Sequence, residues 1–144
     1  MKKGMCVAIA CALVAIVVVG MGLVQKNKKT EYLRIHIRAN SNVDIDQNVK
    51  YQVKNCVVDS IAPMMKNVET FEEAYKIIGQ NLDKIEAVAD ATLKEKGFEY
   101  VASARLCKEE FPTRSYQNLT LDGGVYDALI IDLGTGKGDN WWCV

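Results

Sequence analysis

The chain has 144 residues, of which 49% are hydrophobic and 25% are charged, so it is long enough for one globular domain and a short additional segment. Its net charge of zero hides an uneven distribution. The first 30 residues contain five lysines and no acidic residue, which leaves 13 basic and 18 acidic residues in the remainder. A domain with the resulting net charge of −5 is unsuited to nucleic acid, which is bound by basic surfaces.

The first predicted element is an apolar helix. From Cys6 to Val24 the sequence contains no charged side chain, and lysines flank this run on both sides. As a helix, the run would span about 28 Å, which is close to the hydrocarbon thickness of a bilayer and fits a membrane anchor better than a cleaved signal peptide. We therefore expect a signal or anchor segment in residues 1–29 and a separate extracytoplasmic domain in residues 30–144. The flanking lysines leave the orientation open.

A strand and a helix are expected to open this domain. Apolar and polar residues alternate from Tyr32 to Arg38, which predicts a half-buried strand with three polar side chains on one face: Arg34, His36 and Arg38. The polar run after it, residues 40–42, can cap a helix. Apolar residues then recur at helical spacing from about 43 to 62, and Pro63 is expected to end that helix.

A second long helix is predicted from the capping box at Thr70 to Lys96, where Gly97 is the expected C-terminal glycine. Strands are expected at 98–107 and 125–133, and the sequence from Phe111 to Arg114 should break the chain between them. The predicted fold is α+β: a small three-stranded, mostly antiparallel sheet with two long helices on one face, in the order β-α-α-β-β, preceded by one N-terminal transmembrane or signal helix.

The last eleven residues are unusual. Three glycines alternate with Thr135 and Lys137, and both tryptophans, Trp141 and Trp142, follow side by side. Adjacent tryptophans on an extended segment point to opposite faces, so at most one is expected in the core; the other lies on the surface or meets a partner. The glycine segment does not match a phosphate-binding loop, because Lys137 precedes another glycine and no helix follows.

Candidate catalytic and metal-binding residues are few. His36 is the only histidine, and it is expected to be solvated or hydrogen-bonded, because no nucleophile is placed beside it. The five cysteines lack the C-x-x-C spacing of a zinc site, so we expect no metal and no cofactor. Cys56 lies on an apolar helical stripe and is predicted to be a small core residue. Cys143 is the candidate for a disulfide.

Four separate blocks carry a family resemblance: Leu33–Ser41, Asp46-Gln47, Phe111–Arg114 with Tyr116 and Asn118, and Gly136–Gly138 with Asn140–Val144. In this order they resemble the stage II sporulation protein R family of endospore-forming bacteria, over about residues 31–144, and the N-terminal apolar segment also fits. In that family a few more residues, including a cysteine, usually follow the last block. That cysteine would be the natural disulfide partner of Cys143.

The resemblance implies a non-enzymatic signalling protein of sporulation, made in the forespore and exported into the space between the forespore and mother-cell membranes. There it would activate a membrane-embedded aspartic protease, which processes pro-sigma-E. The implied partners are that protease and, through residues 6–24, the membrane; no nucleic acid and no small-molecule substrate are expected. The candidate partner-binding residues are Arg34, His36, Arg38, Asn40, Phe111, Arg114, Tyr116, Lys137, Asn140, Trp141 and Trp142.

Two alternative functions come from other classes of protein. One is an envelope-associated hydrolase that uses His36 and a nearby carboxylate as acid and base. The other is a structural protein of the septum.

Overall fold

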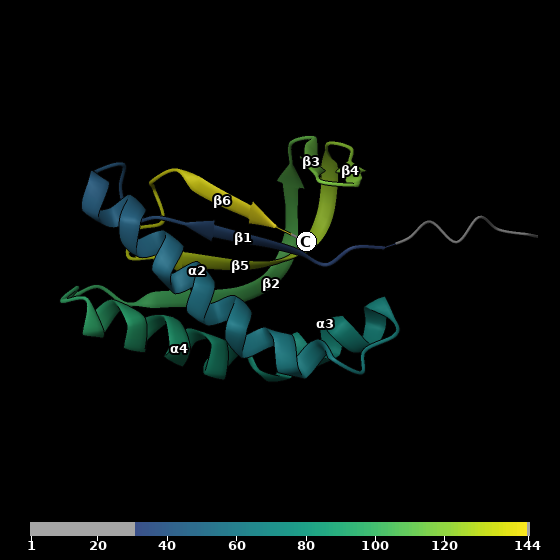
Figure 1. Ribbon diagram of the computed structural model, residues 1–144, viewed down its shortest axis with the longest axis horizontal. Coiled ribbons are helices and arrows are strands. Elements are labelled where there is room, and N and C mark those ends of the chain that lie inside the picture. The colour runs from purple at the N-terminus through teal and green to yellow at the C-terminus, as the bar shows by residue number, and fades with distance from the viewer. Residues whose placement is uncertain (1–30, 144) are drawn as a thin grey trace, which may run out of the picture. The chain divides into compact units, whose positions relative to one another are not determined.

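The computed structural model of the chain describes residues 31–143, so the predicted apolar helix at 6–24 and the segment 1–29 lie outside the described residues. Within residues 31–143, no helix is long and apolar enough to cross a membrane. The elements follow in this order: β1 (Arg34–Arg38), α2 (Asp44–Met65), α3 (Phe71–Gln80), α4 (Leu82–Glu95), β2 (Ala102–Phe111), β3 (Arg114–Tyr116), β4 (Leu119–Leu121), β5 (Gly124–Leu133) and β6 (Asn140–Cys143) (Figure 1).

Four of the strands form one mixed sheet in the order β2-β5-β1-β6. Strand β1 runs parallel to β5 and antiparallel to β6, and β2 runs antiparallel to β5. Strands β3 and β4 form a separate hairpin, which β2 and β5 carry on the side away from the helices (Figure 1). The α+β class is confirmed, but the prediction of three strands was wrong, because β3, β4 and β6 are too short to show an alternating pattern.

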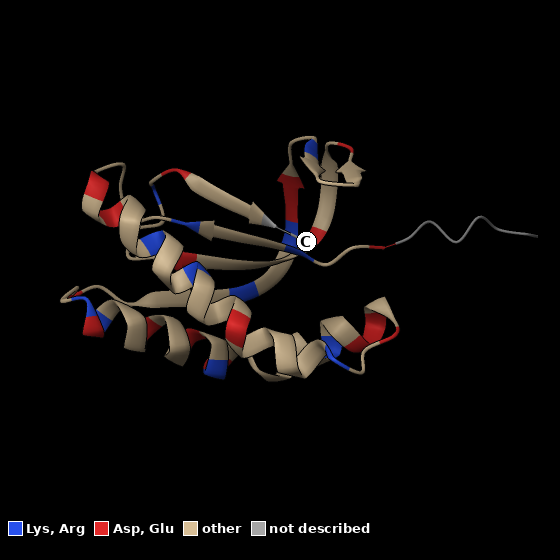
Figure 2. Ribbon diagram, in the orientation of Figure 1, with Lys and Arg blue, Asp and Glu red and all other residues tan. Residues whose placement is uncertain are grey.

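The three helices pack on one face of this sheet and enclose the main hydrophobic core (Figure 1). Amphipathic spacing explains why these segments are helical, since each turns its apolar residues towards the sheet. The buried residues of this core come from the helices and from β1, β2 and β5: Ile37, Val49, Val53, Val57, Ile61, Ile78, Ile85, Ala89, Leu93, Ala102, Leu129, Ile131 and Leu133. Basic and acidic residues are interspersed along the helices (Figure 2).

The predicted second helix is two helices. The side chain of Asn81 donates to the Ile77 carbonyl at 2.8 Å, and its backbone N–H donates to the Ile78 carbonyl at 3.0 Å, so Asn81 ends α3 and α4 starts at the next residue. The predicted start and end are confirmed: Glu73 N–H donates to the Thr70 hydroxyl at 3.2 Å, and Gly97 has a φ of +84°. An asparagine within an apolar stripe is a weak sequence signal, because its capping role depends on the local backbone.

Three further boundaries or positions differ from the prediction. Pro63 lies inside α2, which continues to Met65, since an exposed proline in the last turn removes only one backbone donor. Strand β2 runs from Ala102 to Phe111 and not over 98–107, and Ala102, Ala104 and Leu106 face the main core. Cys56 is exposed, so its prediction as a core residue was wrong: it lies one position before the buried Val57.

Candidate partner-binding surface

The face of the four-stranded sheet opposite the helices carries the predicted polar residues of β1. Residues that are paired across the strands form rows on this face. One row contains Arg105, Ile130, His36 and Trp142, and the next contains Ser103, Asp132, Arg38 and Asn140. We call this surface the open face, defined by the following residues: Arg34, His36, Arg38, Arg105, Glu109, Phe111, Tyr126, Ile130, Asp132 and Trp142. No helix covers it in the described part of the chain (Figure 1).

Arg34 is fully buried on the open face despite its charge. Its guanidinium carbon lies 4.2 Å from the ring centre of Phe111 and 4.8 Å from that of Tyr126. Nη2 also donates to the hydroxyl of Tyr116 at 3.1 Å, which ties the β3–β4 hairpin to β1. Cation–π contacts of this kind offset part of the cost of removing a guanidinium from water. Arg34 therefore stabilises the fold from inside and is not presented to solvent.

His36 is 1% exposed and is covered by Trp142. The two rings stack with centres 3.8 Å apart and an interplanar angle of 19°, and the Phe111 ring approaches edge-on at 5.8 Å. Burial lowers the pKa of His36, with the charge of Arg38 acting in the same direction, while the Asn140 side chain, Glu109 and Asp132 oppose the shift. Asn140 is close enough to favour the protonated ring, yet neither ring nitrogen makes a well-formed hydrogen bond to a described residue. The imidazole is thus held mainly by stacking.

Arg38 begins an ion-pair network that joins three strands. Its guanidinium lies 2.5 Å from Glu109 Oε1 on β2 and 3.6 Å from Asp132 Oδ1 on β5. Asp132 in turn pairs with Arg105 at 2.5 Å. Because these groups are partly exposed, the network sets the charge pattern of the open face more than it contributes to stability.

The glycine segment folds against the loop after β1 and so brings three of the sequence blocks together. Asn40 accepts from the Thr135 backbone at 2.9 Å and donates to Asp46 at 2.9 Å. A side chain at Gly138 would meet the Ser41 carbonyl at 2.3 Å, so only glycine fits there. Burial alone would raise the pKa of Asp46, but its hydrogen bonds from Ser41, Tyr100 and Asn40 lower it. Asn40 therefore positions the chain entering β6.

Lys50 is a buried residue that the sequence patterns did not indicate. It is 1% exposed, and its ammonium donates to Gln47 at 2.7 Å and to the Asp139 carbonyl at 3.2 Å. Burial lowers its pKa, and the charge of Asp139 opposes that shift. The sequence offered one signal of this burial, which is that Lys50 lies next to the apolar stripe of α2. A lysine on a buried stripe needs a hydrogen-bond partner. Lys50 holds the start of β6 against α2.

The two tryptophans point to opposite faces, as predicted. Trp141 packs against the main core, with Lys54 Nζ 5.3 Å from its ring centre, whereas Trp142 packs on His36 and Phe111. Both are half-buried, so each has packing partners and keeps part of its surface in contact with solvent. The Cys143 side chain lies outside what the structure describes, and its predicted disulfide stays a prediction.

The structure brings together six of the predicted residues on or beside the open face: Arg34, His36, Arg38, Phe111, Tyr116 and Trp142. Arg114, in the hairpin, and Asn140, on β6, are exposed near them, while Asn40 and Lys137 belong to the loops beyond the opposite end of β1. Sequence reasoning missed Tyr126, Glu109 and Asp132. The alternation of β5 could have indicated Tyr126 and Asp132, since they share a face with Ile130.

The arrangement is poorly suited to acid–base chemistry. His36 Nδ1 lies 3.9 Å from Glu109 Oε1, which is too long for a hydrogen bond, and the His36 side chain is 2% exposed. A substrate would have to displace Trp142 to reach the ring. Among residues 31–143 no group of three His, Cys, Asp or Glu residues could hold a metal ion. The features define a small α+β domain with aromatic and charged side chains on the face of its sheet opposite the helices.

The chain belongs to the stage II sporulation protein R family, whose model matches residues 29–144. It is similar to the stage II sporulation protein R of Bacillus subtilis (strain 168), with 38% identity over 112 residues. That alignment covers 78% of this chain and 50% of the relative, so the chain spans about half the length of the curated relative that it matches. No solved structure matches. Family membership supports a role in stage II of sporulation.

Proposed function

We propose that the chain is an exported sporulation signal that activates a membrane-embedded aspartic protease, which then processes pro-sigma-E. The observation that carries this proposal is the match of the family model to residues 29–144, which covers the whole described domain. In this proposal the N-terminal segment directs export to the space between the forespore and mother-cell membranes, or anchors the domain there. The domain acts by contact, without catalysis of its own.

The open face and the hairpin beside it form the proposed contact surface. Arg114 is exposed and Tyr116 is half-buried in the hairpin, and Trp142 is half-buried on the open face, where it packs on Phe111. Tryptophan, tyrosine and arginine are the residue types that most often dominate the binding energy at protein interfaces. Arg34 and His36 support this surface from below, because their burial and ring contacts fix Phe111, Tyr116 and Trp142 in place.

A reconstitution tests the proposal. The full chain is co-expressed with the membrane protease and its pro-sigma-E substrate in a host that lacks all three, and the processed sigma factor is detected by immunoblot. We expect processing only when the chain is present and exported. Processing that proceeds equally without the chain would contradict the proposal, as would no processing with an exported and folded chain.

Alanine variants then locate the contact surface. Trp142→Ala and Arg114→Ala should each reduce processing, by about tenfold for an anchor residue. Lys108→Ala is the matched control for Arg114→Ala, because Lys108 is an exposed basic residue on the other face of β2 and pairs only at the surface with Asp127. A Lys108→Ala effect as large as that of Arg114→Ala would assign the contact to general charge and not to the hairpin.

A further inference from the structure

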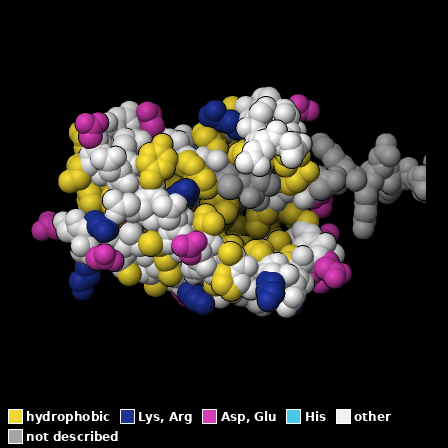
Figure 3. Space-filling view, viewed as in Figure 1, with side chains coloured by type: hydrophobic (Ala, Val, Ile, Leu, Met, Phe, Trp, Pro, Cys, Tyr) yellow, Lys and Arg dark blue, Asp and Glu magenta, His cyan; other side chains and the backbone are white. Residues whose placement is uncertain are grey.

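A hollow lies on the helix side of the sheet, away from the open face. It has a volume of about 350 Å³ and lies where the C-terminal part of α2, the helix α3 and the start of β1 meet. Figure 3 shows a hollow with a hydrophobic lining in this region. We call it the apolar pocket, and its central lining residues are Leu33, Ile61, Met65, Phe71, Ala74 and Ile78.

The apolar pocket is an unfilled end of the main core. It reaches Leu129 and Ile78, which are 0% and 2% exposed, so its floor is continuous with the packed interior. At the volume of liquid water, it would hold roughly ten waters, and its mainly aliphatic walls offer them few hydrogen-bond partners. An occupant with apolar groups would displace those waters at a gain, because poorly bound waters are released and apolar surface is buried.

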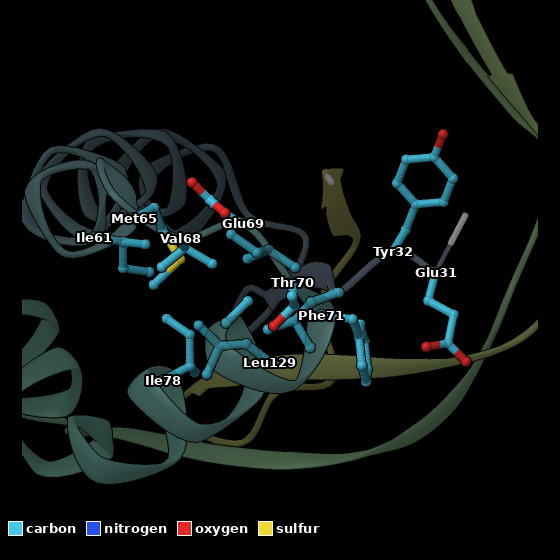
Figure 4. Close-up of a pocket in the computed structure, with 13 residues that line it drawn as sticks. Glu31, Tyr32, Ile61, Met65, Val68, Glu69, Thr70, Phe71, Ile78 and Leu129 are labelled. Carbon is cyan, nitrogen blue, oxygen red and sulfur yellow. The ribbon is translucent and has the colours of Figure 1, made fainter. Parts of the chain in front are cut away.

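The mouth of the pocket is negatively charged. Glu31 and Glu69 are the charged residues among those that line it, and both are exposed (Figure 4). Neither carboxylate forms an ion pair with a residue in 31–143. An acyl chain with an anionic headgroup would therefore be repelled at the mouth, whereas a lysine or arginine next to apolar side chains would be attracted.

We propose that the apolar pocket binds an extended peptide segment of a partner protein, which inserts two apolar side chains and places lysine or arginine beside Glu31 and Glu69. Alternate residues of an extended segment point the same way, so two aliphatic side chains separated by one residue can enter together while flanking residues reach the mouth. A volume of about 350 Å³ with a mainly apolar lining is within the range of ligand-binding pockets in proteins. This surface is independent of the open face, so the proposal does not rest on the proposed function.

Peptide titration of the full chain in phosphatidylcholine nanodiscs tests the proposal, with methyl NMR signals of Ile61, Met65 and Ile78 as the readout. The probe is acetyl-Lys-Leu-Ser-Leu-Lys-amide, and its control is the same peptide with glutamate in place of both lysines. We expect the basic peptide to shift these signals and the acidic peptide to bind about tenfold more weakly, as two surface charge pairs can account for. Glu69→Lys should reduce that preference.

Two matched substitutions show whether binding occurs inside the pocket. Ala74→Phe places a ring where the half-buried Ala74 lines the hollow, and it should abolish the shifts. Ala87→Phe adds the same ring at an exposed position of α4, outside the pocket lining, and should leave binding unchanged. If Ala74→Phe lowers the melting temperature more than Ala87→Phe does, Ala74→Leu replaces it as a smaller change in the same lining, and it should weaken binding as read from the Ile61 and Ile78 signals.

Any of the following outcomes would overturn the proposal. Equal binding of both peptides would leave no role for the carboxylates, and no binding of either would remove the peptide as occupant. Nuclear Overhauser contacts between pocket methyl groups and lipid acyl chains would identify lipid instead. Shifts that depend on protein concentration without peptide would indicate a second copy of the chain. Pocket signals that move when Leu23 and Val24 are changed to serine would show that the chain's own N-terminal segment fills the site.

Discussion

The helix-covered face and the open face of the same sheet exclude water by different means. On the covered face, aliphatic residues such as Ile131 and Leu129 meet the aliphatic stripes of three helices. On the open face, a fully buried arginine and a nearly buried histidine are enclosed by the rings of Phe111, Tyr126 and Trp142. The covered face tolerates volume-conserving exchange of one aliphatic residue for another, whereas the open face depends on particular rings and charges at particular positions.

This difference bears on function. Arg34 and His36 of β1 form a small polar core beneath the open face. Phe111 of β2, Tyr116 of the hairpin and Trp142 of β6 each contact at least one of these two buried side chains, so the core fixes the shape of the surface that they form. In the proposed signalling role, the covered face supplies stability and the open face supplies a preformed contact surface, so less binding energy is lost in ordering it.

The largest effect is expected from Phe111→Ala. The ring is 1% exposed and contacts Arg34, His36, Tyr126 and Trp142, so its loss should lower the free energy of unfolding by about 3–5 kcal/mol. Leu129→Ala on the covered face is the control, with an expected loss of about 2–5 kcal/mol. Urea unfolding of both variants measures the comparison. A Phe111→Ala cost below about 1 kcal/mol would mean that the open face is not a core.

Trp142→Ala should have the next largest effect, roughly 2 kcal/mol, because a half-buried ring loses less than a buried one. It should also expose His36 and bring its pKa back towards the ordinary value, since burial under Trp142 is a main part of what lowers it. An NMR titration of the single imidazole measures the pKa. Trp142→Phe, which keeps an aromatic ring over His36, should retain most of the lowered pKa; an unchanged pKa in Trp142→Ala would show that the stack does not bury the ring.

A smaller effect concerns the pH dependence of stability. The pKa of His36 is lower in the folded protein than in the unfolded chain, so between those two values the unfolded state binds more protons. Stability is therefore highest above the unfolded value of about 6.5 and falls as pH decreases through it. Thermal unfolding between pH 8 and pH 5 should show this loss. His36→Phe, which cannot titrate, should have a flatter profile in that window; equal slopes would assign the dependence to other groups.

Arg114→Ala should have the smallest effect on the fold. Arg114 is exposed in the hairpin, so its removal should change the free energy of unfolding by no more than about 0.5 kcal/mol. It should nevertheless reduce pro-sigma-E processing in the reconstitution, because Arg114 is an anchor residue of the proposed contact surface. Chemical denaturation and the processing assay on the same preparation separate the two properties. A large loss of stability would show that Arg114 belongs to the open-face core.

The sequence patterns correctly predicted most of the helix-covered face of the sheet. Helical spacing from Val49 to Ile61 and strand alternation around Ile37 and Ile131 require only local geometry, since a stripe of apolar residues has one favourable place to go. The same patterns placed Trp141 and Trp142 on opposite faces. They also predicted the capping residue Thr70 and the glycine that ends α4, because caps depend on a few neighbouring backbone groups.

The open face could not be predicted in the same way. Alternation showed that Arg34 and His36 point away from the helices, but polar residues on a strand are normally solvated, so their burial was unexpected. It results from long-range contacts: Phe111 and Tyr116 arrive from more than seventy residues away in the sequence, and Trp142 from more than a hundred. The periodicity of a single helix or strand cannot predict contacts between residues so far apart in the sequence.

The sequence by itself therefore determined the α+β class, the covered face and the family to which the chain belongs, because these depend on local periodicity and on blocks of identical residues. Only the tertiary structure decided the parallel pairing of β1 with β5, the addition of β6 as the edge strand beside β1, and the burial of Arg34 and His36 against aromatic rings. The physical reason is that strand pairing and side-chain enclosure bring together residues distant in the chain. Their free energy depends on the whole arrangement and not on any one segment.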